Sequence, residues 1–352
     1  MFCKKIRFKF KNLWLIIRVL NLSKIFNLGL WFSAKLMKPA GNFCRPISVD
    51  VEPTINCNLN CPFCHNKELS RSKRSLTLAD FQKIINDFPS AVRVNIQGMG
   101  EPLLNPEIVE MVACAKRQKK FVTLTTNGTL LTEKIFQRLS GAGLDRLIIS
   151  LDAAERNLYE KLRPGADFDQ VVKNIGNAVK SRGNRPWPLI NLWSLATRES
   201  IVQLNDLVAL AGDLKVDSLG LQINLTDWGK GAWREKIKRL RLGESGAAID
   251  SAAKRASQED LLFFVNNRYT QFKKNRQEIC RWPWGGAYIA TDGSVVPCCL
   301  VADPRVAALG NIFETPFSKI WQGRAYQSLR KKMKSGNYPE YCKQCYEDNP
   351  SK

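Results

Sequence analysis

Between residues 48 and 225, short runs rich in β-branched and aromatic residues alternate with amphipathic helical patterns. This alternation predicts successive βα units and a parallel sheet. Six such units make an α/β fold, either an incomplete barrel or an open sheet, and we expect a partial (β/α)6 TIM-like barrel. The six expected strands are residues 48–52, 91–97, 121–125, 146–151, 189–195 and 218–223.

Three further segments lie outside this repeating pattern. Residues 226–275 are rich in charge and lack a strand pattern, which predicts a helical linker after the barrel at residues 48–225. Residues 276–348 form a small cysteine-rich C-terminal domain. Residues 1–47 form a basic, amphipathic N-terminal extension.

The N-terminal extension carries ten Lys or Arg residues, and no acidic residue precedes position 50. Its apolar stretch over residues 13–32 is interrupted by Arg18 and Lys24, and each charge near the centre of a bilayer costs about 2.5–3.5 kcal/mol, which disfavours a transmembrane span. Two interpretations are open. The segment is either a helix lying on an anionic lipid surface or a helix packed against the bottom of the barrel. The first would place a cytoplasmic protein at the inner face of the membrane.

Charge and cysteine content narrow the class of protein. Lys and Arg number 54 against 32 Asp and Glu, and the net charge of +22 predicts attraction to anions such as nucleic acid, phospholipid or an anionic substrate. Eleven cysteines, several in CxxC-type spacing and without a recognisable signal peptide, indicate thiolate metal ligands in a reducing cytoplasm. The single histidine, His65, argues against enzymes that need a Ser-His-Asp triad or several histidine ligands.

Cys57, Cys61 and Cys64 form a C-x3-C-x2-C motif in the loop after the first expected strand. This edge of a parallel sheet is where α/β folds place active sites. Three thiolates can bind three irons of a four-iron cubane and leave the fourth iron open for another ligand. Zinc is the alternative, but it takes four ligands, and His65 is poorly placed to be the fourth.

A second set of cysteines has the spacing of another metal site. Two of its cysteines flank an expected hairpin over residues 287–296, and the other two form a CxxC pair. The spacing of this set is compatible with either an iron–sulfur cluster or a structural zinc ion. Cys299 is a candidate spare ligand beside it. The four expected ligands are Cys280, Cys298, Cys342 and Cys345.

The first cysteine motif, with Phe63 before its third cysteine, resembles the signature of the radical S-adenosylmethionine (SAM) superfamily. The run from Gly98 to Pro102, GMGEP, is similar to the family's GGEP motif, with Met99 in place of a glycine. The resemblance implies that the glycines let the backbone approach SAM, that Glu101 receives the SAM ammonium and that Arg163 pairs with the SAM carboxylate. The SAM contacts that it implies are Phe63, Gly98, Gly100, Glu101, Asn127, Ser150, Asp152 and Arg163.

The C-terminal cysteines resemble the SPASM/twitch extension of certain radical SAM enzymes, in the form with one auxiliary [4Fe-4S] cluster. The resemblance implies three cofactors: a SAM-binding [4Fe-4S] cluster, SAM and the auxiliary cluster. It also implies an external one-electron reductant of the flavodoxin or ferredoxin type. Reduced, the first cluster would cleave SAM to a 5′-deoxyadenosyl radical that abstracts hydrogen from the substrate.

The sequence leaves the substrate open. A carbohydrate, glycan or lipid-linked intermediate ranks first, with basic residues around 234–241 as a clamp for an anionic substrate. A peptide or protein maturase is the alternative, although the fifty residues before Cys57 look too short for a leader-peptide-binding domain. An RNA-modifying radical SAM enzyme and a zinc-dependent nucleic-acid-binding protein that is no enzyme are less favoured.

Overall fold

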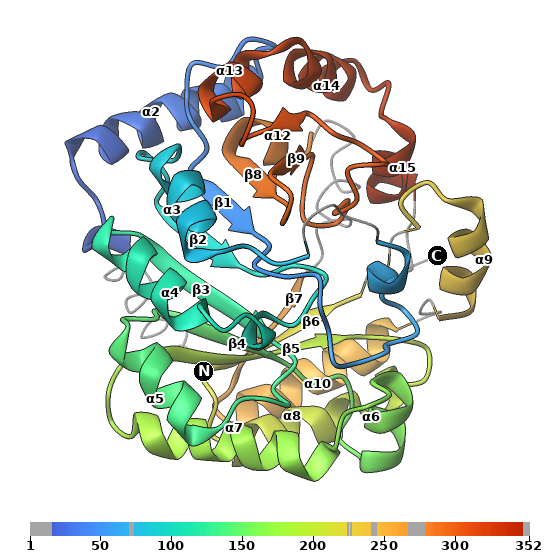
Figure 1. The fold of residues 1–352 in the computed structure, drawn as a ribbon. Helices are drawn as coiled ribbons and strands as arrows, with labels where there is room; N and C mark the ends of the chain where they lie inside the picture. Colours follow the sequence, from blue (N-terminus) through green and yellow to red (C-terminus); the bar gives the residue numbers. More distant parts are fainter. Residues whose placement is uncertain are drawn as a thin grey trace.

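The computed structural model describes residues 16–69, 74–223, 225, 227–240, 245–266 and 279–347. Its centre is a ten-stranded sheet in the order β10-β9-β8-β1-β2-β3-β4-β5-β6-β7 (Figure 1). Strands β8 and β1 to β7 run parallel, whereas β9 and β10 are antiparallel to their neighbours. The strands are β1 (Ser48–Val51), β2 (Arg93–Ile96), β3 (Phe121–Thr126), β4 (Arg146–Ser150), β5 (Leu189–Leu195), β6 (Ser218–Gln222), β7 (Leu262–Asn266), β8 (Gly286–Ile289), β9 (Ser294–Val296) and β10 (Gly310–Asn311).

Helices connect the parallel strands and cover the outer face of the curved sheet (Figure 1). Local sequence explains several helix starts. Thr77 and Asp80 form a capping box at α3, and the side chains of Thr132 and Asp167 cap α5 and α7. The helices are α2 (Leu22–Met37), α3 (Leu78–Asn86), α4 (Ile108–Arg117), α5 (Glu133–Gly141), α6 (Arg156–Leu162), α7 (Phe168–Arg182), α8 (Leu204–Asp213), α9 (Gly231–Leu240), α10 (Gly246–Gln258), α12 (Trp282–Gly285), α13 (Phe317–Gln322), α14 (Arg324–Ser335) and α15 (Glu340–Glu347).

The predicted α/β architecture is confirmed, and strands β1 to β6 correspond to the six expected ranges. One prediction is wrong: the linker over 226–275 is not helical throughout, because β7 forms within it and pairs in parallel with β6. The five residues of β7 do not alternate between apolar and polar side chains, so their sequence pattern does not predict a strand. They form one because they pair with the free edge of β6. Residues 241–244 and 267–275 lie outside the described part.

The C-terminal domain continues the barrel sheet. Its strand β8 pairs in parallel with β1, Ser48 opposite Gly286 and Val51 opposite Ile289. The expected hairpin follows as β8 and β9, with a positive φ of 81° at Gly293 in its turn. The second cysteine set is therefore attached directly to the first strand of the barrel.

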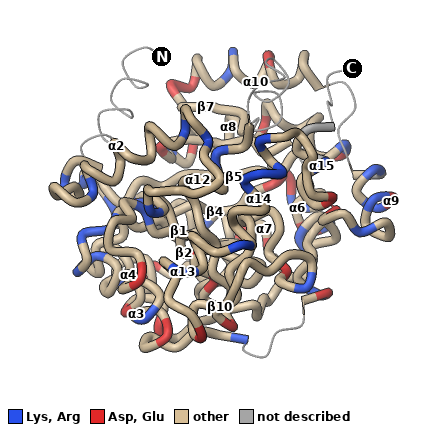
Figure 2. The backbone as a smooth tube through the Cα atoms, turned by 90° about the horizontal axis from the view of Figure 1, so that it is seen from above, with Lys and Arg blue, Asp and Glu red and all other residues tan. Residues whose placement is uncertain are grey.

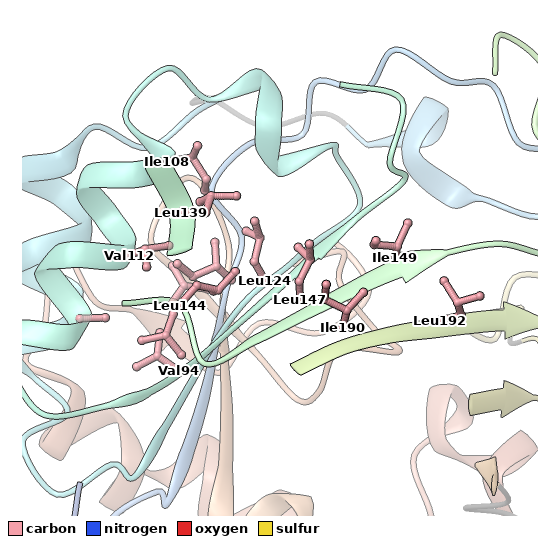
Figure 3. Close-up of a cluster of buried hydrophobic side chains, with 14 of the residues drawn as sticks. Val94, Ile108, Val112, Leu124, Leu139, Leu144, Leu147, Ile149, Ile190 and Leu192 are labelled. Atoms are coloured by element: carbon pink, nitrogen blue, oxygen red, sulfur yellow. The ribbon is translucent and has the colours of Figure 1, made fainter. Parts of the chain in front are cut away.

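Alternate residues of each parallel strand meet two different environments. In β4, Leu147 and Ile149 are fully buried against the helices, whereas Arg146, Ile148 and Ser150 are half-buried and line internal cavities. Apolar side chains of neighbouring strands gather on the helix side (Figure 3). The apolar layer carries the core, and the inner face is free to carry polar groups.

The described part of the N-terminal extension lies against the bottom of the barrel. Val19 belongs to the same apolar cluster as Phe121 and Leu189, the first residues of β3 and β5. Lys24 Nζ donates to the carbonyl of Lys119 at 2.6 Å, after the end of α4. The packed-helix interpretation is thus confirmed for these residues, and residues 1–15 lie outside the described part. In the described residues, no helix is both long enough and apolar enough to cross a bilayer.

Replacing Leu147 by alanine should lower the free energy of unfolding by about 2–5 kcal/mol, because the side chain is fully buried and a cavity would remain. Val202→Ala is the matched control: Val202 is 78% exposed, and we expect a change within about 0.5 kcal/mol. Urea unfolding followed by circular dichroism measures both. Equal effects of the two substitutions would contradict this account of the core.

Candidate active site

The carboxyl ends of the parallel strands surround a cavity of about 280 Å³. The loop after β1 contributes the whole first cysteine motif, and the loop after β2 contributes the GMGEP residues. Because parallel strands end at one edge of a sheet, residues far apart in the sequence meet here. The predicted site residues that line the cavity are Cys57, Cys61, Phe63, Cys64, Gly98, Gly100, Glu101, Asn127, Ser150 and Arg163.

The three thiols of the first motif lie close enough to influence one another. Burial raises the pKa of Cys61 to about 12; Arg163 opposes this shift, and Cys64 and Cys57 add to it. Burial also raises the pKa of Cys57 and of Cys64. A bound metal centre would lower the pKa of these thiols, because its positive charge stabilises the thiolates that ligate it.

The first motif supplies the number of thiols that a four-iron cluster with one open iron requires. In a cubane each thiolate binds a different iron, so the three sulfurs are spread around a larger body. The first motif, with three thiols around a cavity, fits that arrangement.

Side-chain amides fasten the cysteine loop to its neighbours. Asn58 Nδ2 donates to Thr129 Oγ1 at 2.8 Å, and Asn127 Nδ2 donates to Asn58 Oδ1 at 2.9 Å. From the other end of the loop, Asn66 Nδ2 donates to the Met99 carbonyl at 2.9 Å. The loops after β1, β2 and β3 therefore form one hydrogen-bonded unit that holds the thiols in place.

Gly98 and Gly100 are required by the packing of the loop against β1. A Cβ on Gly98 would lie 2.4 Å from Glu52 Cγ, and a Cβ on Gly100 would lie 2.3 Å from the Thr54 carbonyl oxygen. The family resemblance ties these glycines to the approach of SAM. The structure adds a second reason, because any side chain here would displace the residues after β1.

Glu101 bridges two loops from a buried position. It is 2% exposed, and its carboxylate accepts hydrogen bonds from the Leu103 amide at 3.0 Å, the Thr126 hydroxyl at 2.6 Å and the Asn127 amide at 2.7 Å. Burial raises the pKa of Glu101, and these donors, led by the Asn127 amide, oppose the shift. Glu101 thus holds the GMGEP loop to the end of β3, and its contact with the SAM ammonium stays a proposal.

Arg163 and Asp152 form a buried ion pair at the edge of the cavity. Arg163 Nε donates to Asp152 Oδ2 at 2.7 Å, and Asp152 Oδ1 accepts from the Leu195 amide at 2.8 Å. The guanidinium lies 5.9 Å from the centroid of the Phe63 ring. Asp152 is 1% exposed and is not among the described residues that line the cavity, so the ion pair holds Arg163 from behind; the predicted contact of Asp152 with SAM stays a prediction.

The four C-terminal cysteines also come together. Cys298 follows β9, and its pKa is raised well above the ordinary value by burial and by the neighbouring Cys299, Cys342, Cys345 and Cys280. Cys342 and Cys345 lie one turn apart on α15. The structure therefore brings together the predicted second ligand set, with enough thiols to ligate a cluster fully.

A second cavity of about 240 Å³ adjoins the first inside the barrel. Arg146 and Trp193 contribute to its wall. The expected spare ligand Cys299 lies on the wall that both cavities share, so the second cysteine site borders the space in front of the first. The shared lining residues are Gln97, Thr125, Gln222, Cys299 and Leu300.

His65 lies between two tryptophan rings, a contact that no sequence pattern indicated. It is 5% exposed, and its ring centroid lies 3.9 Å from that of Trp228 and 3.8 Å from that of Trp233. Trp233 Nε1 also donates to Glu68 Oε1. Because Trp233 belongs to α9, the stack attaches this helix to the segment after the first cysteine motif.

Ion pairs join α9 and the residue before it to the C-terminal domain, whose helix α15 lies beside α9 in Figure 1. Lys230 Nζ lies 3.3 Å from Asp303 Oδ2. Arg234 Nε donates to Asp227 Oδ2 at 3.1 Å, and Arg234 Nη2 lies 3.5 Å from Glu340 Oε1 on α15. Thus α9 contacts both the first cysteine loop and the helix that carries the CxxC pair.

This role of α9 differs from the substrate clamp predicted for residues 234–241. Arg234 is engaged in ion pairs with the protein itself, and no α9 residue is among the described residues that line either cavity. The side chain of Arg239 and all of Arg241 lie outside the described part. For Arg234 the structure does not support the clamp, because sequence shows where charges cluster and not which partners they face.

Family models match two segments of the chain. Residues 51–201 match the model described as the radical SAM superfamily. Residues 280–346 match SPASM, described as an iron–sulfur cluster-binding domain. The two matches contain all seven predicted cysteine ligands.

Individual relatives agree with these matches. The chain is 27% identical to the PqqA peptide cyclase of Gluconobacter oxydans over 78% of this chain and 76% of that protein. It is 37% identical to a probable GTP 3′,8-cyclase of Methanococcus maripaludis, over 40% of this chain and 47% of that protein. Among solved structures, Streptococcus suis SuiB bound to the precursor peptide SuiA has a TM-score of 0.68 at 19% identity, covering 84% of this chain and 68% of that one, which shows a shared fold.

Anaerobic reconstitution of the purified chain should give about eight irons and eight labile sulfides, because each cysteine set is expected to hold one four-iron cubane. Combining Cys57→Ala, Cys61→Ala and Cys64→Ala should leave about four irons. Cys114→Ala is the control, since Cys114 lies in the core on α4, away from both sets, and should keep the full load. Bound zinc without labile sulfide would contradict both assignments.

Proposed function

The chain belongs to the radical SAM superfamily and carries a SPASM iron–sulfur domain, and from this premise we propose that the enzyme modifies a peptide by radical chemistry. The observation that carries the proposal is the similarity to a peptide cyclase along 78% of the chain. The fold shared with a structure that holds a precursor peptide agrees with it.

The cofactors are SAM, a SAM-binding [4Fe-4S] cluster and an auxiliary cluster. In our proposal Cys57, Cys61 and Cys64 hold the first cluster, because their mutually close thiols border the cavity. Cys280, Cys298, Cys342 and Cys345 hold the auxiliary one. When bound and reduced by an external one-electron donor, the first cluster supplies the electron that cleaves SAM and yields a 5′-deoxyadenosyl radical.

The chain's own residues orient and shield the reactants. We assign Arg163 to the SAM carboxylate, since its guanidinium lines the cavity while Asp152 fixes its direction from behind. Phe63, Asn127 and Ser150 complete the assigned wall of the SAM site. Glu101 keeps the GMGEP loop in register with the end of β3, which preserves the shape of the cavity.

A peptide replaces the carbohydrate, glycan or lipid-linked substrate that ranked first from the sequence. That ranking depended on a clamp at residues 234–241, and Arg234 holds α9 to the rest of the protein instead. The objection to a peptide was the short segment before Cys57. The match to a peptide cyclase over 76% of that protein's length outweighs this objection. RNA and zinc-dependent nucleic-acid binding are likewise not favoured by these relatives.

The placement of the two cysteine sites favours an overall two-electron oxidation of the peptide. Abstraction of a hydrogen atom removes one proton and one electron from the substrate. A second electron and a second proton must then leave to give a closed-shell product. In our proposal, an auxiliary cluster held by Cys298 and its neighbouring cysteines would supply an acceptor for that electron, and the position of Cys299 on the wall of both cavities supports this.

Replacing Arg163 by glutamine should raise the KM for SAM about tenfold or more, since a hydrogen bond to a charged group contributes about 1.5–3 kcal/mol. Asp152→Asn should shift it in the same direction through the orientation of Arg163. The matched control is Arg156→Gln, because Arg156 forms an exposed ion pair with Asp169 on the protein surface. Formation of 5′-deoxyadenosine at varied SAM concentration under strong reductant measures all three. An unchanged KM in fully loaded Arg163→Gln would contradict the assignment.

The peptide proposal is tested with short peptides encoded beside the gene for this chain. We expect one of them to accelerate 5′-deoxyadenosine formation and to lose two hydrogen atoms, as seen by mass spectrometry. Anionic sugars at equal concentration serve as controls. SAM cleavage with modification of a sugar only would overturn the peptide assignment and leave the radical chemistry intact, whereas absence of SAM cleavage by the reduced, loaded enzyme would overturn both.

A further inference from the structure

The outer face of α2 and its flanking residues is covered with exposed apolar side chains. Eleven large hydrophobic side chains are exposed in the described part of the chain, and eight of them come from residues 17–43. Those within α2 recur three and four positions apart, which places them on one face of the helix. We call this set the α2 face: Ile17, Leu22, Ile25, Phe26, Phe32, Leu36, Met37 and Phe43.

Two polar side chains of α2 point into the protein. Lys24 is 1% exposed and donates to the carbonyls of Val19 and Lys119. Asn27 is 4% exposed and exchanges hydrogen bonds with the backbone of Arg45. The inner side of α2 also packs Leu28, Leu30, Trp31 and Ala34 against buried clusters. A surface helix ordinarily buries its apolar stripe and exposes a polar face, so the additional apolar face of α2 indicates a partner outside the described chain.

The charged residues of the segment that carries the α2 face are all positive. No Asp or Glu precedes Asp50, which is itself buried, whereas Arg18, Lys35, Lys38 and Arg45 belong to this segment. Lys and Arg positions are blue in Figure 2. Asp87 lies at one end of the face, where it lines a hollow with Phe43 and Arg45. Lys35 Nζ lies 5.6 Å from the centroids of the Trp31 and Phe32 rings. Its stem thus lies along aromatic surface while its ammonium is presented at the edge of the face.

We propose that the α2 face binds the surface of an anionic phospholipid bilayer. An apolar helix face with a basic edge lies in the headgroup region with its apolar side chains in the acyl boundary, and anionic headgroups attract the cations around it. A second copy of this chain fits less well. A two-fold contact through the same face would bring two predominantly positive edges together, and the repulsion between them would oppose the contact.

The position of α2 keeps the active site clear of the lipid. The helix lies near the amino-terminal ends of the strands, where Val19 packs with Phe121 and Leu189. The cavity with the first cysteine motif lies at the carboxyl ends. Binding through the α2 face therefore leaves the cavity open, and this proposal is independent of which substrate the enzyme uses.

Sedimentation of the full-length chain with vesicles tests the proposal. We expect binding to phosphatidylcholine vesicles that contain about one third phosphatidylglycerol, weak binding to phosphatidylcholine alone, and loss of binding as salt is raised. Combining Leu22→Gln with Phe26→Gln should weaken binding at least about tenfold, because two exposed side chains no longer enter the apolar layer. Val202→Gln, at an exposed apolar residue far from α2 in the sequence, is the matched control and should bind as the unchanged chain does.

Each other outcome overturns the proposal. Absence of binding to the anionic vesicles would do so, as would equal binding by the Leu22→Gln and Phe26→Gln variant. A concentration-dependent dimer that this variant abolishes would assign the face to a second copy instead. Substrate-free SAM cleavage at the unchanged rate shows that the variant is folded, so that lost vesicle binding reports on the surface alone.

Discussion

The position of β1 between β2 and β8 is the constraint on which the rest of the site depends. On one side β1 pairs with the barrel, and on the other it pairs with the first strand of the C-terminal domain. Just after β1, the buried Glu52 accepts hydrogen bonds from the Met99 amide and the Tyr288 hydroxyl, both at 3.1 Å. One carboxylate thus connects the first cysteine loop, the GMGEP loop and the C-terminal domain, and displacing it would disturb all three.

Around β1 and Glu52, hydrogen bonds between polar groups, and not apolar packing, hold the loops at a fixed distance from the cavity. Glu101, Asn58 and Asp152 are all used in this way, each holding a neighbouring segment. The stack of His65 with Trp228 and Trp233 does the same with aromatic surface. Because the contacts of Glu101, of Asn58 and of His65 each join segments that follow different strands, the two cysteine sites and the cavities between them form one assembly and not two independent metal domains.

The N-terminal helix shows how far burial can depart from the hydrophobicity of the sequence. Lys24 and Asn27 are buried because the carbonyls of Val19, Lys119 and Arg45 offer them hydrogen bonds, which compensates for the loss of water. The apolar residues on the opposite side remain exposed as a consequence. The packed-helix interpretation raised by the sequence therefore describes the inner side of this segment, and binding of a lipid surface by its outer side stays a proposal.

The sequence by itself determined the local features of this protein: the alternating strands and helices, the capped start of α3, and the two cysteine sets. These depend on residues close together in the chain, where periodicity and spacing are sufficient. The tertiary structure alone decided that β7 completes the parallel sheet, that Asp152 lies behind Arg163, that Cys299 borders both cavities, and that Arg234 binds Asp227 and Glu340. Each of these depends on which partner a group meets across the fold, and hydrogen bonds, ion pairs and strand edges are satisfied by neighbours in space, whatever their separation in sequence.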